Sequence, residues 1–207
     1  MHRFVLLPVL FLALLLSTPA FAQDTSGAEP NMGNLFQNVT NIADTLKADL
    51  TDLEARIQES RDSIEKGSEV LDAMLASVSA VHDSMAEDSE IWKELDALMD
   101  LWEQRRKSAL EKSETNPEFA KIADAWKTRI STAKDLRNQI STERANSLAL
   151  MRAIESDRDI VLAYYELGQA DKAIESMQKV SSDLTTLNEN MQAIVETAGS
   201  VQNPISN

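Results

Sequence analysis

Apolar side chains recur in alternating steps of three and four residues through residues 34–85. This spacing is typical of a coiled-coil seam, because it keeps a narrow apolar stripe on one side of an α-helix. The pattern predicts one unbroken helix of about 50 residues, roughly 75 Å long. Such a helix needs a partner along its length to be stable. The seam residues are Leu35, Val39, Ile42, Leu46, Leu50, Leu53, Ile57, Ser60, Ile64, Gly67, Leu71, Met74, Val78, Val81 and Met85.

Residues 86–90 are the first place where we expect this seam to end. Asp88 falls on the seam, where an unbroken helix would place its carboxylate among apolar side chains. Ser89 is a suitable N-cap for a new helix. The apolar spacing nevertheless continues at Trp92 and Leu95, so an uninterrupted helix is the alternative.

Two clearer signals divide the rest of the chain. At residues 115–118, Asn116 suits an N-cap and Pro117 suits the first helical position. Gly168 suits a left-handed residue at the end of a helix. The helices expected after the first are therefore 89–113, 119–167 and 170–198.

The composition favours an all-α protein. The chain has five Gly, five Pro and 5% aromatic residues, which disfavours a β-sheet. We expect a single domain over residues 34–198, an elongated antiparallel coiled-coil bundle of about four helices, two long and two short. The turn at Pro117 brings Trp102 level with Trp126. The expected core around it comprises Trp92, Leu95, Trp102, Trp126 and Ile130.

The second helix is expected to turn back along the first at residues 86–90, and the unequal helix lengths then leave the first half of the first helix short of partners. Its apolar stripe is therefore one candidate interaction surface, through which a second copy of the chain is expected to associate. The alternative is that the helix 170–198 folds down onto the stripe. The stripe consists of Leu35, Val39, Ile42 and Leu46.

The N-terminus has the features of a bacterial signal peptide over residues 1–22. A short basic start precedes an apolar run at 4–16 that is shorter than the roughly 20 residues needed to span a bilayer. We predict cleavage after Ala22, a disordered leader at 23–33, a flexible tail at 199–207 and no membrane-spanning segment after cleavage. The expected location is the periplasm, with secretion as the alternative.

The net charge of −14 is unevenly distributed. Residues 101–152 carry 11 basic and 7 acidic side chains, whereas both flanking segments are strongly acidic. An acidic chain is repelled by nucleic acid, which we therefore do not expect as a partner. The basic run of Arg105, Arg106 and Lys107 is the second candidate interaction surface. It either docks on an acidic partner or pairs with the acidic helices of its own chain, and a solvated mixed face is the third interpretation.

The sequence contains few groups suited to catalysis or metal binding. His82 is the one histidine after residue 22, and the chain has no cysteine. Carboxylates such as Asp49 and Asp52 fall on exposed helical faces without the spacing of a calcium loop, and no Gly-rich phosphate loop occurs. We therefore expect neither an enzyme nor a bound cofactor.

One stretch of 17 residues resembles the second half of a tetratricopeptide repeat. The first half of that motif is absent, because Asp157 and Val161 stand where a Trp and a Gly are expected, and no second copy follows near a period of 34 residues. A corner between two helices explains the same spacing, so the chain is not assigned to that family. The matching residues are Tyr164, Gly168, Ala173, Met177 and Val180.

These features together predict an exported, non-enzymatic interaction or scaffold protein that binds unknown protein partners through helical surfaces. The alternative is a holdase-type chaperone that binds unfolded clients between its helices. Methionines suit such a promiscuous surface, although their seam positions indicate core packing.

Overall fold

The computed structural model describes residues 31–202, and within them the protein is all-helical without strands. The predicted all-α class is confirmed, but these residues form five α-helices instead of about four. The predicted signal peptide, most of the predicted leader and residues 203–207 lie outside the described residues. The elements are α1 (Met32–Glu59), the 3₁₀ turn η1 (Ser60–Asp62), α2 (Ile64–Ser84), α3 (Glu90–Ser113), α4 (Glu118–Glu166) and α5 (Ala170–Gln202).

Both ends of the helical region extend further than predicted. Helix α1 begins at Met32, where the Asn31 side chain accepts a hydrogen bond from the backbone N–H of Gly33 at 2.8 Å. Helix α5 continues to Gln202, so residues 199–202 belong to the helix and not to the tail. Between residues 31 and 202, no helix combines the length and apolar character needed to cross a membrane.

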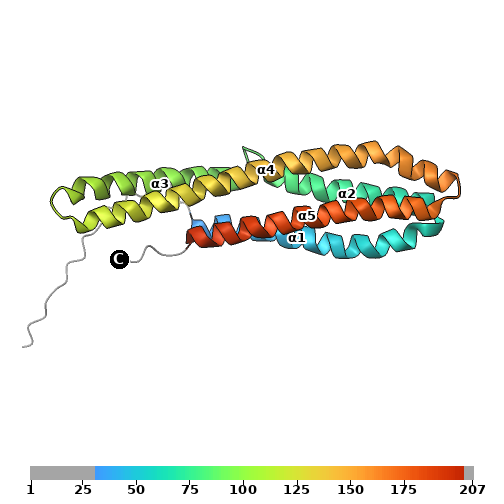
Figure 1. The fold of residues 1–207 in the computed structure, drawn as a ribbon, viewed down its shortest axis with the longest axis horizontal. Helices are drawn as coiled ribbons and strands as arrows, with labels where there is room; N and C mark the ends of the chain where they lie inside the picture. The colour runs from blue at the N-terminus through green and yellow to red at the C-terminus, as the bar shows by residue number, and fades with distance from the viewer. Residues whose placement is uncertain (1–30, 203–207) are drawn as a thin grey trace, which may run out of the picture.

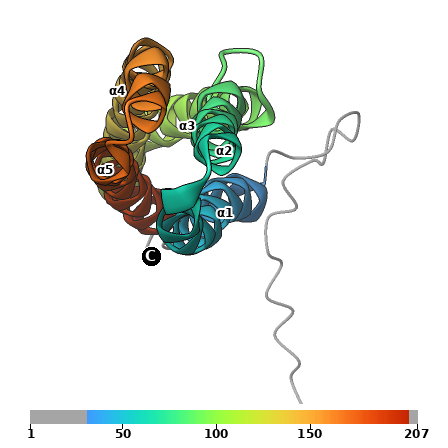
Figure 2. The same cartoon turned by 90° about the vertical axis from the view of Figure 1, so that its right-hand side faces the viewer.

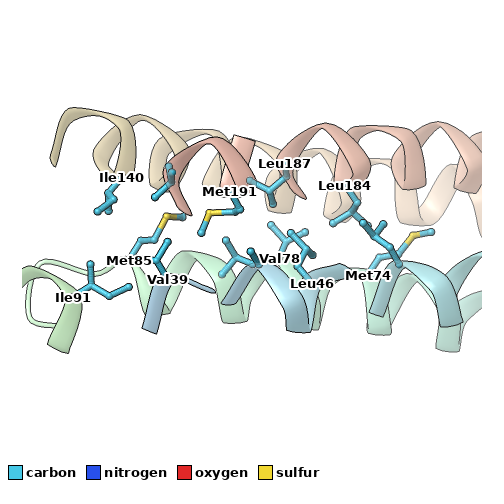
Figure 3. Close-up of a cluster of buried hydrophobic side chains, with 14 of the residues drawn as sticks. Val39, Leu46, Met74, Val78, Met85, Ile91, Ile140, Leu184, Leu187 and Met191 are labelled. Carbon is cyan, nitrogen blue, oxygen red and sulfur yellow. The ribbon is translucent and has the colours of Figure 1, made fainter. Parts of the chain in front are cut away.

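Four helical segments form a bundle that we call the body. It consists of α1, α2, α5 and the second half of α4, which lie side by side in Figure 1 and surround a common axis in Figure 2. Helix α5 packs against both α1 and α4, and α2 packs against α4 and α1. Figure 3 shows side chains from these helices meeting in the core, including Val39, Leu46, Met74, Leu184 and Met191.

The other end of the molecule contains two helices. Helix α3 packs mainly on α4, and together they extend beyond the ends of α1 and α5 (Figure 1). We call residues 101–130 the arm. Helix α4 has 49 residues, about 74 Å at 1.5 Å per residue, and therefore runs through both the arm and the body.

The prediction of one unbroken helix over residues 34–85 is wrong, because the chain turns back at residues 60–63. The Ser60 hydroxyl donates to the Ile57 carbonyl at 2.7 Å and lies 2.9 Å from the Tyr165 hydroxyl. Ser63 is extended (φ −146°, ψ 119°), and its hydroxyl accepts from the Lys66 N–H at 3.2 Å. Ser60, a polar residue on the seam, thus ends α1, and Ser63 caps the start of α2.

Gly67, another non-apolar seam position, contributes to the same corner. A Cβ atom at Gly67 would lie 2.5 Å from Cε2 of Tyr165, closer than atoms can approach. Because Gly67 has no side chain, the Tyr165 ring fits between α2 and α4, within reach of Ser60.

The break expected at residues 86–90 is confirmed, since α2 ends at Ser84 and α3 begins at Glu90. The Trp92 indole N–H donates to the Met85 carbonyl at 2.7 Å, which satisfies a backbone group exposed by the break. The direction of the chain differs from the prediction. Helices α2 and α3 follow one another in the same direction in Figure 1, and the reversal that was expected here occurs at residues 60–63.

The two later turns occur where the sequence predicts them. The Asn116 side chain accepts from the Glu118 N–H at 3.1 Å, just before α4. Gly168 has a φ of +67°, the left-handed conformation that ends α4 and leads into α5.

Candidate interaction surface on the arm

The first predicted interaction surface lies inside the body. Leu35, Val39 and Leu46 are buried and Ile42 is partly buried, because α5 packs along α1. The prediction that the first half of this helix lacks partners is therefore wrong, and the alternative, in which the last helix covers the stripe, describes the structure. The reversal at residues 60–63 also brings α2 against α1, which the seam pattern did not reveal.

The second predicted surface, Arg105 to Lys107, lies on the arm but does not form one patch. Successive residues of an α-helix point about 100° apart, so these side chains diverge. Arg105 lies over the Trp126 ring, 5.4 Å from its centroid. Arg106 pairs with Glu103 of its own helix at 2.9 Å, and Lys107 is exposed.

Arg105 instead belongs to a face that combines residues from both helices of the arm. Arg129 lies 5.4 Å from the Trp126 centroid and 5.4 Å from the Trp102 centroid, so two guanidinium groups share the Trp126 ring. Lys112 lies 5.7 Å from the centroid of Phe119 nearer the tip. A cation placed over the face of an aromatic ring is attracted to it by a cation–π interaction. We call this set the basic–aromatic face: Arg105, Lys112, Phe119, Trp126 and Arg129.

Two positive charges lie close together on this face. Burial lowers the pKa of Arg129, and the nearby positive charge of Arg105 lowers it further.

The predicted core residues are unequally buried. Trp92, Leu95, Trp102 and Ile130 have exposed fractions of 8% or less. Trp126 is only partly buried and packs at the edge of the core. Arg129 lies 5.4 Å from the centroids of both Trp102 and Trp126, so one guanidinium group reaches both indoles where the sequence suggested a shared apolar layer.

Some basic residues of the middle segment do pair with acidic residues elsewhere in the chain. Arg137 of α4 lies 3.1 Å from Asp96 of α3 and 4.9 Å from the Trp92 centroid, at the base of the arm. Outside the middle segment, Arg158 of α4 pairs with Asp72 of α2. Within the middle segment, the pairing interpretation therefore describes Arg137 at the base of the arm.

The tip of the arm also carries an exposed apolar side chain. Leu110 is 44% exposed on the last turns of α3, close in sequence to Lys112. The arm thus presents aromatic, apolar and cationic groups together, a combination enriched at protein interfaces.

The candidate metal and catalytic residues lie apart from this surface. His82 is on α2 with its Nδ1 atom 3.1 Å from Asp83. In the part of the chain that the structure describes, no three His, Asp or Glu side chains are grouped so that they could hold a metal ion.

The sequence did contain a signal for the basic–aromatic face. Arg129 follows Trp126 by three residues, a spacing that places both on one side of a helix. What the sequence does not show is that Arg105 and Trp102 of α3 face them, because this depends on the exact register of the hairpin. Comparison of the chain with protein-family models, with curated proteins and with solved structures gave no match.

Proposed function

We propose that this protein is an exported, non-enzymatic adaptor in which the body acts as a helical spacer and the arm docks on a protein partner. The arrangement of the arm supports this proposal most strongly. It extends beyond α1 and α5 as a pair of helices, so its sides are not covered by the rest of the described chain (Figure 1).

The charge distribution indicates the chemistry of the partner. Residues 101–130 carry seven Lys or Arg and five Asp or Glu, in a chain whose net charge is −14. A basic arm on an acidic molecule is attracted to acidic surfaces, and such complementarity raises association rates and fixes orientation. We therefore infer a partner with an acidic helical surface that packs along the basic–aromatic face.

The predicted signal peptide supports a periplasmic location for this interaction. A signal peptidase cut after Ala22 would release residues 23–207. Mass spectrometry of the protein purified from the envelope fraction tests this step, and retention of residues 1–22 would contradict it.

Site-specific photo-crosslinking in the native cell envelope tests the docking proposal. A crosslinker replacing Leu110 at the tip is expected to capture a discrete partner whose contacted region is acidic. A crosslinker replacing Lys66 at the opposite end of the body is the control and is expected to capture much less.

Charge reversal then tests whether the arm is responsible. Arg105→Glu with Lys112→Glu is expected to abolish the Leu110 crosslink, because both side chains are exposed and belong to the basic–aromatic face. The matched control, Lys47→Glu with Lys66→Glu, makes the same charge change on the body and should leave the crosslink intact. Equal loss in both double variants would contradict docking through the arm.

The holdase alternative has less support. The methionines suited to a client-binding surface are largely internal, with Met74, Met85, Met177 and Met191 each 1% exposed or less. A holdase would suppress aggregation of a heated test protein at stoichiometric amounts, whereas the adaptor is expected to leave it unchanged.

A further inference from the structure

A buried carboxylate lies between α4 and α5 in the body, on the part of α4 that follows the arm. Glu143 is 8% exposed. One of its oxygens accepts from the Asn146 amide at 3.1 Å, and the other accepts from the Asn190 amide at 3.1 Å. These two amides are its hydrogen-bond partners in the described chain, and neither carries a charge.

The two amides supply hydrogen bonds to Glu143 but no opposite charge. A buried carboxylate normally requires a cation as well as hydrogen bonds, because desolvation of an ion costs several kcal/mol. The polar contact of Glu143 with Asn190 also helps set the register of α4 against α5. A neutral amide in place of Glu143 could set the same register. The register therefore does not explain why this position carries a carboxylate.

Two adjoining grooves open on either side of this carboxylate. One, of about 350 Å³, is lined by Asn146, Leu150, Asp183 and Leu187, and the other, of about 380 Å³, by residues including Gln139 and Ile194. Glu143 and Asn190 line both grooves. Together the grooves follow α4 from Asn138 to Ala153, a distance of about 22 Å at 1.5 Å per residue.

The grooves offer several hydrogen-bond acceptors. Asn146 and Asn190 each direct one N–H at Glu143 and retain their carbonyl oxygens as acceptors. The Oε1 atom of Gln139 is buried without a hydrogen-bond partner. Asp183 adds a second carboxylate at the other end of one groove.

This chemistry suits an elongated organic cation. Terminal ammonium groups donate three hydrogen bonds each, and the methylene chains between the charged groups can pack on Leu150 and Leu187. A divalent metal fits less well, because no three His, Asp or Glu side chains among residues 31–202 are grouped so that they could hold a metal ion. We propose that the α4–α5 groove binds a short linear polyamine, with Glu143 and Asp183 pairing with its ammonium groups.

Isothermal titration calorimetry of the purified protein with spermidine tests this site. Saturable binding with one ligand per chain is expected. Glu143→Gln keeps the shape of the side chain but removes its charge, and is expected to weaken binding at least about tenfold, the effect of losing a charged hydrogen bond. Glu189→Gln removes an exposed charge from the same helix and is expected to change the affinity by less than about twofold.

A second variant separates ligand binding from the stability of the polar layer. Ala149→Leu fills the groove that holds both Glu143 and Asp183 from its exposed wall without altering a charge, and is expected to abolish or strongly weaken spermidine binding while the helical circular dichroism and melting are retained. Tetramethylammonium, which lacks N–H donors, is expected not to displace spermidine. Equal weakening by Glu143→Gln and Glu189→Gln, wild-type affinity in Ala149→Leu, or displacement by tetramethylammonium would each overturn the proposal in favour of general counterion binding.

Discussion

The body and the arm are built from the same seam pattern but differ in how many helices cover it. In the body, a seam residue such as Leu46 lies in the core formed where α2 and α5 pack against α1, and it is 1% exposed (Figure 3). In the arm, a seam residue has one partner helix, and Trp126 is only partly buried. The comparison teaches that three neighbouring helices bury a seam residue of the body, whereas in the arm Trp102 is buried and Trp126 remains partly available to a partner.

The long helix α4 contains this contrast within a single element. Its second half contributes Ile140 and Ile154 to the body core, whereas its first half contributes Trp126 and Arg129 to an outer face. We therefore expect the same type of substitution to have different effects along one continuous helix. The following predictions test that difference.

The two tryptophans of the arm should give the largest contrast. Trp102→Ala removes a ring that is 2% exposed and is expected to lower the free energy of unfolding by about 3–5 kcal/mol. Trp126→Ala removes a partly buried ring that also contacts two arginines and is expected to cost about 1–3 kcal/mol. Denaturant unfolding of both variants measures the difference. Equal losses would mean that Trp126 belongs to the core.

The apolar stripe of α1 distinguishes a buried seam from an open one. Leu46→Ala is expected to cost about 2–5 kcal/mol, because α5 and α2 enclose the side chain. Thr45→Ala, at the exposed neighbouring position, should change stability by less than about 0.5 kcal/mol. Thermal and urea denaturation provide the measurement. If Leu46→Ala lowered the free energy of unfolding as little as Thr45→Ala, the stripe would be a free surface and not part of the core.

Two glycines of the body should respond in opposite directions. Gly67→Ala places a Cβ atom 2.5 Å from the Tyr165 ring and is expected to destabilise the protein by about 1–3 kcal/mol. Gly199→Ala places a Cβ atom 3.4 Å from the Phe36 ring, an ordinary contact, and is expected to stabilise α5 by up to about 1 kcal/mol. Melting temperatures of the two variants test this. Stabilisation by Gly67→Ala would show that Tyr165 does not occupy the corner.

The two interruptions before α2 and α3 should differ by a smaller amount. Ser63→Ala removes an N-cap hydrogen bond and is expected to cost about 1 kcal/mol. The Ser89 side chain makes no capping hydrogen bond, so Ser89→Ala is expected to change stability by less than about 0.5 kcal/mol. Equilibrium unfolding compares the two, and a larger cost for Ser89→Ala would contradict the assigned caps.

The Ser63 substitution also has an expected signature in titration. The pKa of Glu65 is lowered, first by a backbone hydrogen bond and then by the Ser63 hydroxyl. The resulting stabilisation is present above the ordinary pKa of a glutamate and is lost as the pH falls through the lowered value. Ser63→Ala should therefore move the Glu65 pKa back toward its ordinary value, which NMR titration of the side chain can follow.

The sequence predicted the helices better than it predicted the reversals between them. The signals at Pro117 and Gly168 are local, because each residue restricts the backbone directly, and both turns occur where expected. The reversal at Ser60 was missed because serine and glycine are tolerated on a long seam as well as in a corner. The corner depends on Tyr165, which is distant in the sequence but contacts both Ser60 and Gly67 in the structure.

The same limit applies to the candidate surfaces. Once the reversal was assigned to residues 86–90, the stripe from Leu35 to Leu46 was left without a partner, although the structure buries it under α5. The basic run at Arg105 to Lys107 was recognised by composition, but its three side chains diverge around the helix. The basic–aromatic face depends on the pairing of α3 with α4, a tertiary property that spacing along one helix does not contain.

Hydrogen exchange along α4, read by mass spectrometry, tests the distinction between body and arm most directly. Backbone amides open more readily where fewer buried contacts hold the helix. Amides in residues 118–130 are expected to exchange markedly faster than those in residues 139–161 of the same helix, and those of α3 beyond residue 101 should match the faster group. Uniform slow exchange along the whole of α4 would contradict a two-helix arm projecting from a four-helix body.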